Sequence, residues 1–458
     1  MKSSLSYGQG RFFYVVLMIK NSKFTIKDSS GLKHTYFPNF NFLLPQEELG
    51  NNSVFYSKLK KYFELFEQSP KSSDSVEDTI RKEIANVRKF LFEVSESCNL
   101  RCRYCVYSGK FSDRRQHSNK MMDWETARSA VDYISHYFKE NEEIRRTPYF
   151  LTIAFYGGEP LLNFKLIEKV IEYSRESFQK IFMGKYQYSL VFDLTTNGLL
   201  LDESKIDFLV KNNCGIMFSL DGPESIQDLN RGKGNFQKLM RNINYIKNKY
   251  PDYLRERVVF STVYAKDTDL ELVRDFFSDE IFEECRSLKF GYVVERFSDL
   301  RFPELGINEK AVVEKIKDKK RRGEKLFRIE DEILKVYFGM DLGTLIMKRH
   351  GSFGGYCILG SKMMFFKSNG DISGCEKMSE SFKIGDIYKG INYSRIKEIH
   401  KEWLEKTKRC GNCAYKAICL ACMAQIGVNG ELMFDGYCES LKENFHKRAG
   451  EYIEFQKI

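Results

Sequence analysis

The sequence predicts an α/β fold: a partial (β/α)6 barrel of the TIM type, preceded by a small α+β module and followed by a cysteine-rich domain. Three observations support this prediction. Apolar strands alternate with longer helical segments over residues 86–300, the first 85 residues follow a different pattern, and seven of the twelve cysteines lie after residue 350. A chain of 458 residues can bury a large core and is expected to divide into two or three domains.

Residues 1–85 are expected to form the N-terminal module. Two β-like runs, 12–19 and 23–28, are separated by only three polar residues, which predicts a hairpin. Aromatic and leucine residues then recur at helical spacing over 52–68. The polar, turn-forming segment 69–75 is the best candidate for a linker to the next domain.

Residues 86–300 are expected to form the partial barrel. Strand–helix alternation predicts parallel strands joined by right-handed crossovers, and six units rather than eight predict an incomplete barrel. The first crossover helix is predicted over 123–140, where Asp123 is a suitable N-cap ahead of an apolar stripe. The six predicted strands cover residues 89–96, 149–157, 188–197, 214–222, 257–265 and 287–294.

Distinctive polar segments follow the first four predicted strands. The carboxyl ends of parallel strands meet at one rim of a barrel, so these segments should lie together there. They cover residues 98–105, 157–160, 195–198 and 219–223.

After the barrel, a helical bridge is expected over residues 301–350 and the cysteine-rich domain over 351–458, with a helix at its end. The basic residues of the helical stretch 309–325 are most simply interpreted as a solvated face.

The composition is that of an ordinary globular protein, with 42% apolar and 30% charged residues. The net charge of +10, from 73 basic and 63 acidic residues, lacks the dense basic stripe with interleaved aromatics that nucleic acid would require. No run approaches the roughly 20 apolar residues of a membrane span, and the N-terminus has no cleavage-site pattern. We therefore expect a cytoplasmic protein that binds neither nucleic acid nor membrane.

Cys98, Cys102 and Cys105 lie on one short loop, with three and then two residues between the thiols. Clustered thiols in a chain without an export signal most often hold metal. Zinc would need a fourth ligand, and none lies nearby in the sequence. Three thiolates without an adjacent histidine suit an iron–sulfur cube that keeps one iron open. By contrast, Cys214 and Cys285 are expected to be buried free thiols, and none of the six histidines is assigned a catalytic role.

The run Cys98–Cys105 resembles the hallmark of the radical S-adenosylmethionine (SAM) superfamily, including the aromatic Tyr104 before the last thiol. The resemblance implies that the three thiolates ligate a 4Fe–4S cluster whose fourth iron binds SAM through its amine and carboxylate. Reduction then cleaves the sulfonium and yields a 5′-deoxyadenosyl radical, which abstracts hydrogen from a substrate. An external one-electron reductant such as a flavodoxin or ferredoxin is implied.

The other strand ends resemble the SAM-binding elements of this superfamily. Near Glu159, two glycines permit close backbone approach and the carboxylate supplies a counter-charge for the SAM ammonium, although a tight turn with an incidental acid is the alternative. Arg231 would pair with the SAM carboxylate, or is simply a surface arginine. The SAM contacts implied by the resemblance are Gly157, Gly158, Glu159, Pro160, Thr196, Asn197, Ser219, Asp221 and Arg231.

The C-terminal cysteines resemble the SPASM domain, which carries two auxiliary iron–sulfur clusters, expected to be 4Fe–4S, in peptide-modifying members of the superfamily. By that pattern one cluster would be ligated by Cys357, Cys375 and Cys422. The other would be ligated by Cys410, Cys413, Cys419 and Cys438.

Two features depart from the SPASM pattern. Two residues rather than three separate Cys419 from Cys422, and no eighth cysteine follows Cys357. The first auxiliary cluster would therefore keep an open iron for a substrate thiolate, or a non-cysteine side chain would complete it. Taken alone, Cys410–Cys422 would also fit a structural zinc site.

The resemblance implies chemistry on peptides. Members with a SPASM domain mostly form thioether, ether or carbon–carbon crosslinks in ribosomally made peptides, or oxidise a cysteine or serine of sulfatases to formylglycine. Residues 1–85 favour a crosslinking maturase, because many of these carry an N-terminal module that binds the leader of a precursor peptide by strand addition. An ordinary N-terminal cap on the barrel is the alternative interpretation of this module.

Glu376 stands where the sulfatase-maturing branch has an aspartate base. Its longer side chain argues against that branch but leaves Glu376 as a candidate catalytic base. A sulfatase-maturing enzyme therefore remains the alternative. A third interpretation is a non-catalytic partner protein whose fold is stabilised by zinc or by iron–sulfur clusters.

Overall fold

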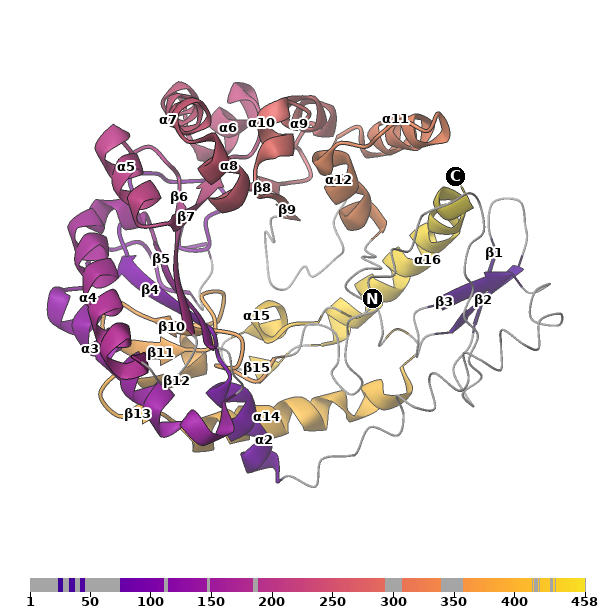
Figure 1. Cartoon of the computed structure of the whole chain (residues 1–458). Coiled ribbons are helices and arrows are strands. Elements are labelled where there is room, and N and C mark those ends of the chain that lie inside the picture. Colours follow the sequence, from indigo (N-terminus) through magenta and orange to yellow (C-terminus); the bar gives the residue numbers. More distant parts are fainter. Residues whose placement is uncertain are drawn as a thin grey trace, which may run out of the picture.

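The centre of the molecule is a ten-stranded sheet (Figure 1). The computed structural model describes residues 24–27, 33–37, 42–45, 75–110, 114–145, 149–183, 188–292, 307–338, 357–413, 415, 419, 421–428, 431–432 and 434–457. Six adjacent strands of the sheet are parallel and follow chain order, as predicted. They are β4 (Lys89–Ser95), β5 (Tyr149–Gly157), β6 (Tyr188–Thr196), β7 (Cys214–Ser219), β8 (Val258–Tyr264) and β9 (Ser287–Tyr292).

The helices that connect these strands form an arc along the outside of the curved sheet (Figure 1). Asp123 caps the first crossover helix, because its carboxylate accepts the backbone N–H of Thr126 at 2.7 Å. The predicted α/β class with a partial barrel is thus confirmed. The helices are α3 (Trp124–Glu140), α4 (Phe164–Phe182), α5 (Glu203–Lys211), α6 (Glu224–Arg231), α7 (Phe236–Lys249), α8 (Pro251–Arg257), α9 (Leu270–Phe277) and α10 (Glu280–Glu284), with 3-10 turns η2 (Glu142–Ile144) and η3 (Pro160–Asn163).

The C-terminal region extends the same sheet beyond β4. Strand β10 (Met364–Phe366) pairs with β4 in parallel, and β11 (Asp371–Ser373), β12 (Lys383–Asp386) and β13 (Gly390–Ile391) follow in antiparallel order. The buried Phe366 ring packs against Phe90 and Phe92 of β4. The cysteine-rich domain and the barrel therefore share one core.

The remaining described C-terminal elements lie inside the arc of the barrel helices (Figure 1). They are η4 (Glu380–Phe382), α14 (Tyr393–Thr407), η5 (Lys408–Asn412), α15 (Met423–Ile426), β14 (Gly427–Val428), β15 (Glu431–Leu432) and the terminal helix α16 (Asp435–Lys457). Between barrel and C-terminal region, α11 (Glu309–Arg321) and α12 (Arg328–Phe338) fall within the expected helical bridge. Among the described helices, none has the length and apolar content that a bilayer crossing requires.

Helix α2 (Val76–Ala85) was not predicted from the sequence. Ser75 caps it by accepting the N–H of Asp78, and Ile80 and Ile84 are buried. Lys397 of α14 forms an ion pair with Glu77 at 2.9 Å. Residues 76–85 therefore pack on the C-terminal region, although the sequence pattern groups them with the N-terminal module.

The N-terminal module contains an antiparallel sheet of β1 (Phe24–Lys27), β2 (Lys33–Phe37) and β3 (Phe42–Pro45). Strand β1 lies within the predicted run 23–28 and beside α16 (Figure 1). The predicted run 12–19, the helical stretch 52–68 and the linker up to residue 74 lie outside the described residues.

Candidate functional site

The loop with Cys98, Cys102 and Cys105 leaves the carboxyl end of β4. Its backbone turns so that amide groups face sulfur: the N–H of Leu100 donates to Cys98 Sγ at 3.3 Å, and the N–H of Tyr107 donates to Cys105 Sγ at 3.4 Å. All three thiols are partly exposed. Burial raises the pKa of each thiol, to about 11 for Cys98. Thiolates here need a cation, and sulfur atoms that accept amide hydrogen bonds fit an iron–sulfur cluster.

Gly157 and Gly158 allow the end of β5 to approach the start of this loop. A Cβ atom on Gly157 would lie 2.1 Å from the carbonyl oxygen of Ser95, and one on Gly158 would lie 2.2 Å from that of Ser97. The N–H groups of Gly158 and Glu159 donate to these same two carbonyls, at 2.7 and 2.8 Å. The close neighbour of both glycines is thus the chain leading into the cysteine loop, and their contact with SAM stays a prediction.

Glu159 connects the ends of β5 and β6. Its carboxylate, only 1% exposed, accepts hydrogen bonds from the Thr196 hydroxyl at 2.6 Å, the Asn197 N–H at 2.8 Å and the Leu161 N–H at 3.1 Å. Burial raises the pKa of Glu159 to about 7, although these donors act in the opposite direction. Pro160 is buried at the start of η3, and the Asn197 amide donates to Asn99 of the cysteine loop at 2.8 Å.

Asp221 and Arg231 form a buried ion pair beside the cysteine loop. The pair is bidentate, with both N···O distances 2.9 Å, and the two residues are 0% and 8% exposed. The Tyr104 hydroxyl also donates to Asp221, at 2.5 Å. The predicted partner of Arg231 was a ligand carboxylate. Arg231 also has a protein partner, Asp221, and its Nη1 lies 4.0 Å from Cys102 Sγ; the contact with a ligand carboxylate stays a prediction.

Two further contacts hold the cysteine loop to the far strands. The Arg103 guanidinium forms a bidentate ion pair with Asp267, after β8, at 2.6 and 2.8 Å. Its Nε donates to the Asn230 side chain at 2.8 Å. Ser219 ends β7 nearby, and its carbonyl accepts the Gln227 amide at 3.5 Å. The loop is thereby connected to the ends of β5, β6, β7 and β8.

Glu376 lies against the cysteine loop although 271 residues separate it from Cys105 in the sequence. The Tyr107 hydroxyl donates to the Glu376 carbonyl at 3.5 Å, and the Cys375 thiol donates to the Glu376 carboxylate at 3.2 Å. Burial raises the pKa of Tyr156, and Glu376, Cys105 and Cys375 all act on it electrostatically. These interactions place the Cys375 segment beside the cysteine loop.

The seven C-terminal cysteines interact in two groups. Cys422 acts electrostatically on both Cys357 and Cys375, and burial raises the pKa of Cys357 to about 11. In the other group the thiols act electrostatically on one another; its members are Cys410, Cys413, Cys419 and Cys438. The donor set of each group is all thiol, which suits iron–sulfur clusters as well as zinc. Across the described ranges, no three Cys, His, Asp or Glu side chains converge on a single-ion site.

Four residues at the site were not predicted from the sequence: Tyr107, Tyr156, Arg103 and Asp267. The first two had a positional signal, since Tyr107 follows Cys105 by two residues and Tyr156 directly precedes Gly157. Asp267 had none, because its relation to Arg103 arises only from the fold.

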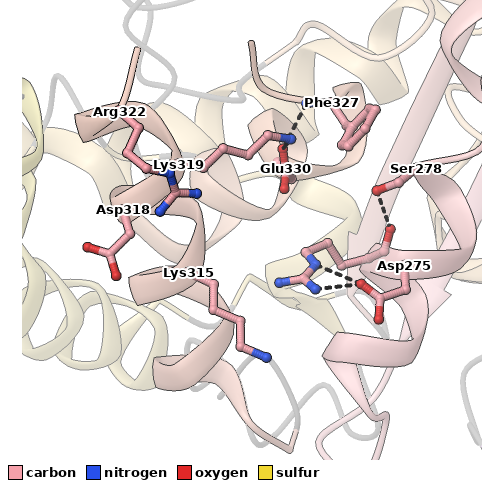
Figure 2. A pocket seen from close by; sticks show the side chains of 9 residues that line it. Asp275, Ser278, Lys315, Asp318, Lys319, Arg322, Phe327 and Glu330 are labelled. Atoms are coloured by element: carbon pink, nitrogen blue, oxygen red, sulfur yellow. Dashed lines mark hydrogen bonds and ion pairs between the residues drawn. The ribbon is translucent and has the colours of Figure 1, made fainter. Parts of the chain in front are cut away.

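A cavity of about 450 Å³ lies away from this site, between α9, α11 and α12 (Figure 2). Two of its lysines are already paired: Lys319 donates to Glu330 at 2.7 Å, and Lys315 pairs with Glu271, which is not a lining residue. The lining residues are Arg274, Asp275, Ser278, Lys315, Asp318, Lys319, Arg322, Phe327 and Glu330.

Comparison with known proteins identifies a radical SAM domain in this chain. Residues 92–277 match the Radical SAM superfamily. A cysteine-type anaerobic sulfatase-maturating enzyme of Clostridium novyi is 27% identical over 77% of this chain and 92% of its own length. The radical SAM cyclopropyl synthase TigE of Paramaledivibacter caminithermalis is 30% identical over 41% of this chain and 36% of its own length. The chain spans only 36–43% of the length of the first relatives that it matches.

Solved structures share the fold. Native anSMEcpe with bound AdoMet and Kp18Cys peptide is 22% identical, with a TM-score of 0.56, over 81% of this chain and 99% of the other. Residues 92–277 therefore form a radical SAM domain, and the chain resembles radical SAM maturases. The superfamily implies SAM binding and a 4Fe–4S cluster.

Proposed function

We propose that this chain is a radical SAM/SPASM peptide maturase. It cleaves SAM reductively to a 5′-deoxyadenosyl radical, abstracts hydrogen from a ribosomally made precursor peptide, and installs a thioether, ether or carbon–carbon crosslink. One observation carries this proposal: the contact between Tyr107 and Glu376 joins the cysteine loop to the Cys375 segment. A substrate held between them would face both cysteine groups.

Cys98, Cys102 and Cys105 would hold the SAM-binding cluster. When bound, this 4Fe–4S cluster supplies the electron that splits the sulfonium of SAM. The protein's own contribution is positioning: ends of four strands hold the loop, and Leu100 and Tyr107 direct N–H groups to its sulfurs. A fixed geometry matters because a primary carbon radical is unselective.

SAM would bind along the ends of β5, β6 and β7. Thr196, Asn197 and Ser219 lie at or directly after the ends of these strands. Asp221 fixes the Arg231 guanidinium, whose remaining nitrogen, Nη1, lies 4.0 Å from Cys102 Sγ and would use its second hydrogen for a ligand carboxylate. Glu159 would act on the SAM ammonium indirectly, because it holds the ends of β5 and β6 together.

The C-terminal groups would hold two auxiliary clusters. Cys357, Cys375 and Cys422 supply only three thiolates for the first, so one iron would stay open or take a non-cysteine ligand. The second would be ligated by four: Cys410, Cys413, Cys419 and Cys438. Glu376, beside Cys375, is the candidate base that removes a substrate proton.

The N-terminal sheet would bind the leader of the precursor peptide. Within the described strands, β1 and β3 each pair on one side only, with β2 between them. An extended leader would add to one of these edges through backbone hydrogen bonds. The remaining parts of the proposal are a cytoplasmic location and an external one-electron reductant, such as a flavodoxin or ferredoxin.

A sulfatase-maturing activity is the second candidate. It is favoured by the resemblance to the Clostridium novyi enzyme, which covers 92% of that protein. A base also stands beside Cys375, although it is a glutamate.

The test is an anaerobic reaction of the reconstituted protein with SAM, a reductant and either of two peptides. The first is a short peptide encoded beside this gene, and the second carries a sulfatase maturation segment. A crosslink removes two hydrogens and joins two residues, which fragmentation by mass spectrometry locates. Formylglycine at one residue would favour the second candidate, and an unchanged mass for both peptides would contradict both activities.

A further inference from the structure

His117 contacts both ends of the cysteine loop. Its backbone N–H donates to the carbonyl of Tyr107 at 3.1 Å, two residues after the last thiol. Its ring Nδ1 lies 3.4 Å from the carbonyl of Glu96, two residues before the first thiol. The ring also meets Tyr107 edge to face, with 6.2 Å between ring centres. One residue thus closes the loop between positions 96 and 107.

The other ring nitrogen of His117 reaches the loop's last thiol. Nε2 lies 3.5 Å from Cys105 Sγ, within hydrogen-bond range for sulfur. The three thiols differ in their side-chain neighbours: Cys102 has Arg231 at 4.0 Å, whereas Cys105 has His117. Because a metal-bound thiolate carries no proton, the ring must donate through Nε2. A neutral imidazole then has no hydrogen on Nδ1, so the approach of Nδ1 to the Glu96 carbonyl is a packing contact and not a second hydrogen bond.

We propose that His117 is a positioning residue for the iron-binding loop. It holds the Cys105 sulfur through Nε2 and thereby favours both cluster retention and cluster reduction. This inference rests on the proposed function, since it requires a cluster on the three thiols. Nothing in the sequence pattern pointed to it, because His117 lies twelve residues beyond Cys105 and has no metal-ligand spacing.

The charge of the cluster is the physical reason that the contact favours reduction. Reduction adds one electron to the cluster, so a hydrogen bond to a ligating sulfur stabilises the reduced form more than the oxidised form. Removal of the donor should therefore move the midpoint potential to a more negative value. A change of about tenfold in the reduction equilibrium corresponds to 59 mV for a one-electron step.

Three substitutions separate the two ring contacts. In His117→Gln the side-chain amide can occupy the position of Nε2, so the donor to Cys105 is kept. In His117→Asn the amide can occupy the position of Nδ1, so only the Glu96 contact is kept. His117→Phe retains the ring volume and loses both. His136→Asn is the control, because this exposed histidine on α3 contacts the carbonyl of Asp132 at 2.8 Å.

The measurement is a redox titration of the reconstituted full-length protein, followed by the electron paramagnetic resonance signal that changes when SAM is added. Iron and sulfide per chain are measured in parallel. We expect a more negative midpoint, by about 59 mV, for His117→Asn and His117→Phe, and no shift for His117→Gln or His136→Asn. Cluster loss in the Asn and Phe variants with retention in the Gln variant would also support the inference.

Two results would overturn it. The first is a midpoint potential of His117→Asn equal to that of the wild type, or equal shifts or equal cluster loss in all three His117 variants. Such a result would exclude a role for the Nε2 contact and leave the proposed function intact. A wild-type protein without any SAM-sensitive signal would instead overturn the proposed function, and this inference with it.

Discussion

Replacement of Gly158 by alanine should strongly destabilise the protein, because a methyl group has no room at this position. A Cβ atom there would lie 2.2 Å from the carbonyl oxygen of Ser97, whereas ordinary van der Waals contact begins at 3.4 Å. The neighbour is backbone and has no rotamer to change. Relief requires the end of β5 and the segment before Cys98 to separate by roughly 1.2 Å.

The cost follows from the contacts that this separation breaks. The N–H of Gly158 donates to Ser95 and the N–H of Glu159 donates to Ser97. Each such hydrogen bond contributes about 1 kcal/mol net, and overpacking a rigid interior costs about 1–3 kcal/mol more. The expected loss of about 3–5 kcal/mol is a large part of the 5–15 kcal/mol that typically stabilises a domain. The cysteine loop should lose its support at the same time.

Urea unfolding of the metal-free protein, followed by circular dichroism, measures this loss. The matched control is Gly436→Ala at the start of α16, where a Cβ atom meets nothing within 4 Å. Alanine is favoured over glycine in helices, so this control should not be destabilised. If the free energy of unfolding of Gly158→Ala stayed within about 0.5 kcal/mol of the wild type, the claim that position 158 has no room for a Cβ atom would be refuted.

Three further substitutions test acidic groups of the site. Asp221→Ala should cost about 3–5 kcal/mol in the same urea assay, because it leaves the buried Arg231 guanidinium unpaired; Asp207→Ala, at an exposed pair, should cost far less. Burial raises the pKa of Glu159 to about 7 in the folded protein, above the ordinary 4.5 of a glutamate, so its contribution to stability is full below pH 4.5 and is lost as the pH rises through 7. Glu159→Gln should remove this decline of about 3 kcal/mol from the pH profile of unfolding, and an unchanged profile would contradict the raised pKa. Glu376→Gln should slow peptide modification while 5′-deoxyadenosine still forms, and an equal loss of both products would count against its role as a base.

The strands of the barrel were predictable because each is a short apolar run bounded by turn residues. The predicted bounds of β5 agree with the structure, and those of β4 and β6 differ by one residue. Strand β10 was not predictable, since three residues carry no period of their own and it forms only because β4 offers a free edge. Helix α2 had a signal that was overlooked, namely Ser75 three residues before Asp78 and ahead of the buried Ile80.

The candidate site was predictable as a set of residue types but not as a set of contacts. Cysteine spacing indicates which thiols act together, because ligands of one centre are often close in sequence. The partners of Glu159, Arg231 and His117 lie at separations that only the fold determines. Arg231 is an example: the sequence leaves open whether it binds a ligand or lies on the surface, and only the tertiary structure shows that it is buried and paired with Asp221.

The central claim is that a cluster on Cys98, Cys102 and Cys105 splits SAM. The direct measurement is the amount of 5′-deoxyadenosine that the anaerobically reconstituted protein forms from SAM and dithionite. We expect this product from the wild-type protein and none from Cys102→Ala, while Cys214→Ala, at a buried thiol outside both cysteine groups, should keep the activity. Equal yields from the Cys102→Ala and wild-type proteins, or none from an iron-loaded wild type, would contradict the claim.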